Sequence, residues 1–283
     1  MTETERRSLL CPNCHRLISR DEPLCPYCGT KRPGSWLKNN PFTRAAGNAD
    51  WLISAIITVN VIMYVISLVI SRGLPGHGYG LLSALSPDEY SLLILGSTGV
   101  VPIDRYDRLW TLLTANYLHG GIFHILFNMM ALRQIAPLVA REYGPWRMFS
   151  IYTIGGVIGY LVSYWAGVGY TIGASAAICA LIGAMLYYGK SRGGVYGQAV
   201  FREVGGWVVG LFLFGLIVPG INNWGHGGGI VGGVLIGLAL GYSEKRRENL
   251  FHRFLAGFCI LATIAALVLG LLSAFYTVNA TTL

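Results

Sequence analysis

Charged residues are scarce in this sequence: they make up 12% of its 283 residues, whereas 53% of the residues are hydrophobic. A soluble globular domain carries about 25% charged residues, so this composition excludes that class. Beyond residue 50 the chain consists largely of apolar runs, and a helix needs about 17 to 25 apolar residues to cross a bilayer. The sequence therefore predicts an all-α membrane protein with several transmembrane helices.

Seven apolar runs are candidates for these helices. They cover residues 51–71, 122–141, 146–166, 174–189, 204–219, 226–242 and 254–276. As a helix, the run 174–189 would span about 24 Å, which is less than a bilayer core of about 30 Å. We therefore expect its first residue to lie below the outer surface, under a water-filled recess.

The first 45 residues lack the apolar segment of a cleavable signal peptide and carry eight Lys or Arg residues. We therefore expect an N-terminus in the cytosol and, after seven spans, a C-terminus outside. Of the 21 Lys and Arg residues, only Arg72, Arg105 and Arg108 then lie outside, which is the bias expected of a helical membrane protein. We attribute the net charge of +8 to topology, expect no nucleic-acid partner, and predict the plasma membrane of a prokaryote.

Cysteine is scarce as well, but four of the six cysteines form two pairs, CPNC at 11–14 and CPYC at 25–28. Two such pairs are typical of a tetrahedral zinc site, and a cytosolic location disfavours the alternative of disulfides. The predicted structural zinc ligands are Cys11, Cys14, Cys25 and Cys28. A module this small has almost no core, so we expect it to need the metal to fold.

These features predict four segments. Residues 1–33 form a zinc-ribbon-like cytosolic module, and residues 34–49 form a linker rich in Pro, Gly and Asn. A six-helix core spans residues 50–242, and residues 243–283 contain a cytosolic loop and an extra transmembrane helix.

One serine, Ser175 in the stretch TIGASAAICALIGA, begins an apolar run among small residues. Serine is a common packing residue in membrane helices, because small side chains let backbones approach closely. The alternative is a nucleophile, and a serine hydroxyl then needs a base, usually histidine. We expect His119, His124 and His226 at the same outer depth as Ser175, whereas His77 falls in the outer loop and His15 and His252 on the cytosolic side.

Rows of small residues suggest how Ser175 could meet His226. Gly229, Gly233, Gly237 and Gly241 recur every four residues after His226, and Ser175, Cys179 and Gly183 form a similar row. Two such faces favour close helix packing, which would bring the hydroxyl and the imidazole together. The alternative is a helix pair in which His226 is merely interfacial, although ionisable groups within membranes are costly and usually functional.

The motif HILFN places His124 and Asn128 four residues apart, and hence on one helix face. Both side chains can donate hydrogen bonds to the oxyanion that forms when a serine attacks a carbonyl. The amide of Ser175, at a helix start where N–H groups are unpaired, is a third candidate donor. The alternative is that Asn128 only ties two spans together.

The sequence resembles the rhomboid family of intramembrane serine proteases. The matching residues are GASA at 173–176, HILFN at 124–128 and GHGGGIVGGVLIG at 225–237, and His119 looks like a further family histidine that shapes the outer loop. The resemblance covers residues 50–242. It implies a rhomboid-like bundle of six transmembrane helices, with the seventh helix as an addition.

The resemblance also implies a function. The family cuts transmembrane protein substrates within the lipid bilayer, near the outer face, with a Ser-His dyad and no cofactor for catalysis. Ser175 would be the nucleophile and His226 the base. His124, Asn128 and the amide of Ser175 would form the oxyanion hole.

Three positions depart from the family pattern: Ala176 follows the serine, Gly225 precedes the histidine, and Cys179 replaces an aromatic residue. The alternative interpretation is therefore a catalytically inactive rhomboid-like protein that binds transmembrane clients. A small permease is disfavoured, because the span interiors carry few charges apart from Arg133.

Overall fold

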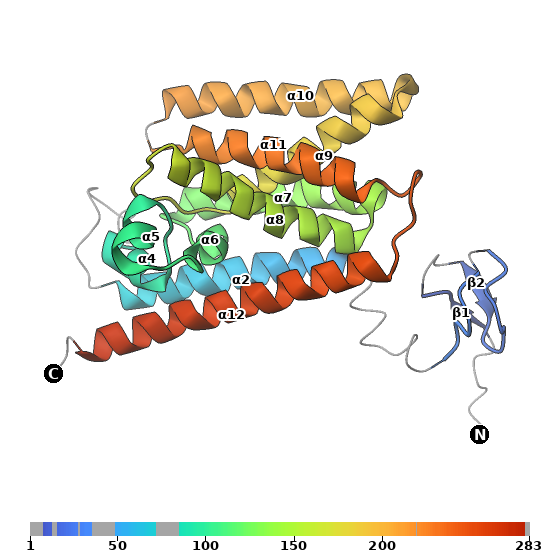
Figure 1. The fold of residues 1–283 in the computed structure, drawn as a ribbon, viewed down its shortest axis with the longest axis horizontal. Helices are drawn as coiled ribbons and strands as arrows, with labels where there is room; N and C mark the ends of the chain where they lie inside the picture. The colour runs from blue at the N-terminus through green and yellow to red at the C-terminus, as the bar shows by residue number, and fades with distance from the viewer. Residues whose placement is uncertain are drawn as a thin grey trace. The chain divides into compact units, whose positions relative to one another are not determined.

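The computed structural model of the chain describes residues 8–12, 16–27, 29–35, 49–71, 85–218 and 220–280. The chain divides into two compact units, Met1–Leu52 and Ile53–Leu283. In its described residues the smaller unit contains two short strands, and the larger unit is helical (Figure 1).

In the N-terminal unit, strand β1 (Ser8–Leu10) pairs antiparallel with β2 (Leu17–Ser19). The last pair of this ladder, Leu10 with Leu17, is repeated fourteen residues later by an isolated bridge between Leu24 and Lys31. A cysteine follows the first residue of each pair. Two similar hairpins therefore carry the first cysteine of each pair, Cys11 and Cys25.

The backbone hydrogen bonds of these hairpins repeat in the same way. Cys11 N–H donates to the carbonyl of Arg16, and Cys25 N–H donates to the carbonyl of Thr30, both at 2.9 Å. Each hairpin thus holds its first cysteine by a bond to the residue five positions later.

Within the described residues, seven long helices follow, and each overlaps one of the seven predicted apolar runs. They are α2 (Ala49–Ile70), α7 (Ile122–Tyr143), α8 (Pro145–Trp165), α9 (Ser175–Arg192), α10 (Gly194–Ile217), α11 (Asn223–Leu240) and α12 (Leu250–Ala280). Five of them, α2, α7, α8, α10 and α12, are long and apolar enough to cross a membrane. The chain is therefore an integral membrane protein.

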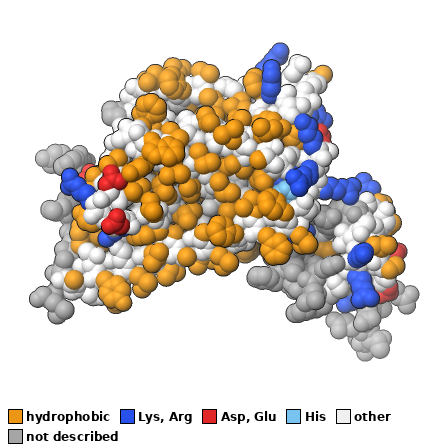
Figure 2. Space-filling model, viewed as in Figure 1, with side chains coloured by type: hydrophobic (Ala, Val, Ile, Leu, Met, Phe, Trp, Pro, Cys, Tyr) orange, Lys and Arg blue, Asp and Glu red, His pale blue; other side chains and the backbone are white. Residues whose placement is uncertain are grey.

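The surface of the helical unit agrees with this conclusion. On the face shown in Figure 2, hydrophobic side chains cover the helices, whereas Lys, Arg, Asp and Glu lie toward the two ends. Such a band is expected where lipid tails surround the middle of a protein and water surrounds its ends.

The segment between α2 and α7 was expected to be an outer loop, but its described part is largely helical. It contains α4 (Glu89–Leu95), α5 (Val100–Tyr106), α6 (Thr111–Thr114) and the 3₁₀-helix η1 (Ala115–Tyr117). Asp88 caps α4 by accepting a hydrogen bond from the N–H of Ser91, and Gly96 ends the helix with a φ of +109°. α4 and α6 pack against α12, and α6 also packs against α8.

Helices α9 and α11 pack through small residues, as the sequence predicts. A methyl group on Gly229 or Gly233 would overlap the carbonyl oxygen of Ala176 or Ala180, respectively. From the predicted row on α9, Cys179 lies against Gly229 and Gly183 lies against the backbone of Ile230, and the neighbouring Ala176 and Ala180 share this contact. The predicted fourth glycine of the α11 row, Gly241, lies just beyond the end of the helix.

The loop between α11 and α12 is tied to the start of α8 by one buried arginine. The side chain of Arg147 is fully buried and donates hydrogen bonds to the carbonyls of Gly241 and Arg246. The backbone N–H of Arg147 donates to Glu248 Oε1 at 3.0 Å. The end of the bundle opposite the start of α9 is thus fixed by polar bonds.

Candidate active site

Ser175 is the first residue of α9, and His226 lies in the first turn of α11. His226 Nε2 lies 2.8 Å from Ser175 Oγ, within hydrogen-bond distance. Both residues are partly exposed, so a ligand can reach them. Among the described residues, the second ring nitrogen, Nδ1, has no hydrogen-bond partner. Such a pair can act as a nucleophile and a base, with no third residue of the described chain bonded to the imidazole through Nδ1.

Gly173 keeps a space open beside Ser175. Its φ of +120° is one that glycine adopts readily. A methyl group built on Gly173 would lie 2.6 Å from His124 Nε2 and 3.7 Å from Ser175 Oγ. The absence of a side chain therefore leaves room between the hydroxyl and the imidazole of His124, where a carbonyl oxygen of a ligand could lie.

His124 can donate a hydrogen bond into this space. The N–H of Gly120 donates to His124 Nδ1 at 3.3 Å. A neutral imidazole that accepts at Nδ1 carries its proton on Nε2, and Nε2 is the atom beside Gly173 and Ser175. The local backbone thus selects the tautomer that an oxyanion donor needs.

The other two expected donors occupy different positions. Asn128 is buried, and its side-chain Nδ2 donates to the carbonyl of His124, one turn earlier on α7, at 2.9 Å. Ala174, the residue before α9, makes no side-chain cap, so its side chain accepts no hydrogen bond from the N–H of Ser175. The structure therefore places His124 Nε2 beside the space next to Ser175, whereas the Asn128 amide bonds to its own helix.

His119 is fully buried, and its ring meets that of His124 edge to face, with 4.9 Å between the ring centroids. Burial, with the nearby His124 acting in the same direction, holds the pKa of His119 well below its ordinary value. His119 is thus a neutral residue that packs on His124.

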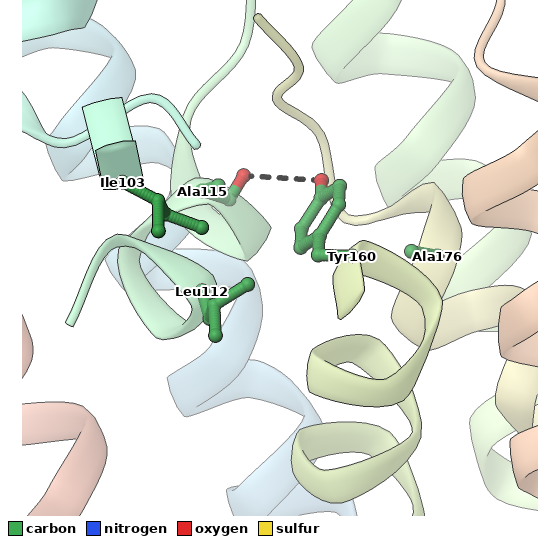
Figure 3. Close-up of a cluster of buried hydrophobic side chains, with 5 residues drawn as sticks. All are labelled: Ile103, Leu112, Ala115, Tyr160 and Ala176. Carbon is green, nitrogen blue, oxygen red and sulfur yellow. Dashed lines mark hydrogen bonds between the residues drawn. The ribbon is translucent and has the colours of Figure 1, made fainter. Parts of the chain in front are cut away.

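Tyr160 of α8 was not singled out by the sequence, yet it supports the segment before Ser175. Its hydroxyl donates to the carbonyl of Gly173 and, at 3.4 Å, to that of Ala115. The N–H of Gly173 donates to the same Ala115 carbonyl at 2.8 Å. Figure 3 shows Tyr160 between Ala115 and Ala176, in a cluster that also contains Ile103 and Leu112.

Cys179 and His252 do not take part in the contact between Ser175 and His226. Cys179 is buried one turn after Ser175 and lies against Gly229. His252 is in the first turn of α12, where its Nδ1 accepts the N–H of Asn249 at 3.1 Å. His15 and His77 lie outside the described residues.

Of the four predicted zinc ligands, Cys11 and Cys25 are buried in one cluster, with Leu9 and Ile18. Cys14 and Cys28 lie outside the described residues. Within the described ranges, no group of three or more His, Cys, Asp or Glu side chains could hold a metal.

Comparison with known proteins identifies similar chains. A family model described as the rhomboid domain matches residues 106–243. RHOMBOID-like protein 4 of Arabidopsis thaliana is 28% identical over 259 residues, which cover 81% of this chain and 66% of the relative. Rhomboid protease GluP of Bacillus subtilis (strain 168) is 36% identical over 136 residues, which cover 47% of this chain and 26% of the relative. The putative rhomboid protease YdcA of the same bacterium is 31% identical over 140 residues, which cover 49% of this chain and 70% of the relative.

Proposed function

Because this chain belongs to the rhomboid family, we propose that it is an intramembrane serine protease that cuts transmembrane protein substrates with Ser175 and His226. The observation that carries this proposal is the distance of 2.8 Å between Ser175 Oγ and His226 Nε2. Two relatives whose names describe them as a protease and a putative protease add support.

In the proposed reaction, Ser175 Oγ attacks the carbonyl carbon of the scissile peptide bond while His226 Nε2 takes the hydroxyl proton. His226 then gives this proton to the leaving amine, which leaves an acyl group on Ser175. Water, deprotonated by His226, attacks the acyl carbon and frees the serine.

The oxyanion of this reaction would lie in the space that Gly173 leaves open. His124 Nε2–H and the amide of Ser175 would donate to the oxyanion there, and removing one such donor typically slows a protease by about 100-fold to 1000-fold. Asn128 would contribute by fixing the turn of α7 that carries His124, or by turning its amide toward the substrate.

The test is a cleavage assay with a model transmembrane substrate, together with labelling by a fluorophosphonate probe that reacts with activated serines. We expect the wild type to cleave and to be labelled, and Ser175→Ala and His226→Ala to do neither while keeping the unfolding temperature of the wild type. A folded wild type that neither cleaves nor reacts would instead support the inactive protein that binds transmembrane clients.

For the N-terminal unit, we propose a structural zinc ion held by Cys11, Cys14, Cys25 and Cys28. The two repeated hairpins support this assignment, since each holds its first cysteine by the same backbone bond and the two cysteines share one buried cluster. Thiolates are suitable zinc ligands, and the site would stabilise a unit with a very small core.

For the orientation and location of the protein, we propose what the sequence predicts. The N-terminal unit would be cytosolic, Ser175 would lie toward the outer face, and the membrane would be the plasma membrane of a prokaryote. The balance of Lys and Arg residues across the helices supports this orientation.

A further inference from the structure

The position of the His226 imidazole depends on the start of α11. Its Nδ1 makes no hydrogen bond within the described part of the chain, so no side chain orients the ring through that atom. The N–H of His226 instead donates to the carbonyl of Asn222 at 3.1 Å, in the first turn of the helix. Whatever fixes Asn222 therefore fixes the backbone that carries the imidazole.

Asn222 is the cap of α11, and its carboxamide forms three hydrogen bonds. Its Oδ1 accepts the N–H of Gly225 at 2.9 Å, which satisfies a free amide of the first turn. Its Nδ2 donates to Thr171 Oγ1 at 2.9 Å and to Ser163 Oγ at 2.6 Å. One side chain thus joins the start of α11 to the end of α8 and to the segment before α9.

Thr171 lies on the segment that leads to Ser175. Its backbone N–H and carbonyl both pair with Thr98, at 2.7 and 3.1 Å, and two residues later Gly173 bonds to Ala115. The segment is therefore held firmly from the α4–α6 side. The bond from Asn222 links the helix of His226 to this fixed segment, four residues before Ser175.

We propose that Asn222 is a positioning residue, which sets the distance between His226 and Ser175 by tying the first turn of α11 to Thr171. This inference rests on the proposed function, since it assigns Asn222 a role in that reaction. Asn222 touches neither Ser175 Oγ nor the His226 imidazole through the bonds described, so it acts through the backbone of α11.

Two substitutions separate capping from positioning. Asn222→Ser keeps an oxygen that caps the helix but removes both N–H donors. Asn222→Asp keeps the cap, and its second oxygen can accept hydrogen bonds from the hydroxyls of Ser163 and Thr171, which can turn to donate. The second variant therefore restores the tie that the first variant lacks.

The readout is the rate constant of fluorophosphonate labelling, because loss of folded protein lowers the amount labelled but not the rate constant. We expect Asn222→Ser to slow labelling about tenfold or more, since a small misplacement of reacting groups can cost about 100-fold. We expect Asn222→Asp to stay within about threefold of the wild type. In substrate cleavage, Asn222→Ser should lower kcat and leave KM unchanged.

Asn223→Ala is the matched control, because Asn223 is the neighbouring asparagine and lies against Gly215 of α10 instead of Thr171. It should label at the wild-type rate. If the wild type is labelled and Asn222→Ser is labelled with the same rate constant, the inference is wrong and the proposed function stands. If the probe labels the wild type no faster than Ser175→Ala, both the inference and the proposed function are wrong.

Discussion

Gly233, where α11 packs closely on the backbone of α9, is an informative position for testing the proposed geometry. A methyl group on Gly233 would overlap the carbonyl oxygen of Ala180. The overlapped atom belongs to the helix backbone, which cannot move aside as a flexible side chain could. In Gly233→Ala, the two helices therefore have to separate.

The size of the effect follows from this overlap. Moving the methyl carbon out to about 3.0 Å from this oxygen, the shortest distance that real side chains show, requires a separation of about 1 Å, and overpacking of this kind typically costs about 1 to 3 kcal/mol of stability. If the shift is passed along the helices, the distance from His226 Nε2 to Ser175 Oγ rises from 2.8 Å to about 3.8 Å, beyond hydrogen-bond range. A misplacement of this size should lower kcat about 100-fold.

The assay is substrate cleavage by purified Gly233→Ala, with the unfolding temperature measured on the same sample. Gly257→Ala is the control, because Gly257 also lies in a transmembrane helix but a methyl group there would meet nothing within 4 Å. The control should cleave at the wild-type rate. If Gly233→Ala cleaves within about threefold of the wild type, the close packing of α9 and α11 does not set the geometry of the pair, and the reasoning is wrong.

Two further predictions concern Ala176 and the zinc site. Ala176 follows the nucleophile, where the family pattern has glycine, and its side chain is buried in the cluster that contains Tyr160. Ala176→Gly should therefore change the cleavage rate by about tenfold at most, or about 1.4 kcal/mol, because it removes one buried methyl group and no reacting atom. A larger gain would mean that Ala176 keeps the wild type inactive. Protein purified under reducing conditions should contain one zinc ion per chain by metal analysis, and changing both Cys11 and Cys25 to Ser should remove it while the helical unit stays folded. Wild-type protein without zinc would contradict the second prediction.

The sequence predicted an apolar run within each of the seven long helices of the described residues, because apolar runs carry a strong hydropathy signal, and five of these helices could cross a membrane. It was least accurate at α10, which begins at Gly194 instead of residue 204. The first ten residues of this helix include Gln198, Arg202 and Glu203, so they do not read as part of an apolar run. Hydropathy locates the part of a helix within the lipid, and a helix can continue beyond it.

The helices α4 to α6 could not be predicted in the same way. They are short, and they are held by contacts with α8 and α12 that lie far away in the sequence. The same limit applies within the site. Ser175, His124 and His226 stand in recognisable motifs, whereas Tyr160 and Asn222 act on the carbonyl and hydroxyl groups of distant segments, which no local pattern reveals.

The buried Arg147 has a consequence for how the protein is made. Its guanidinium bonds to the carbonyls of Gly241 and Arg246, which follow it by 94 and 99 positions. These acceptors do not exist while α8 is being synthesised and inserted, so the charge has to stay near water at the membrane boundary until α11 and the loop after it are complete. Docking of this end of α8 is therefore a late step of assembly, and a chain that stops at Leu240 leaves the arginine without the loop that receives it.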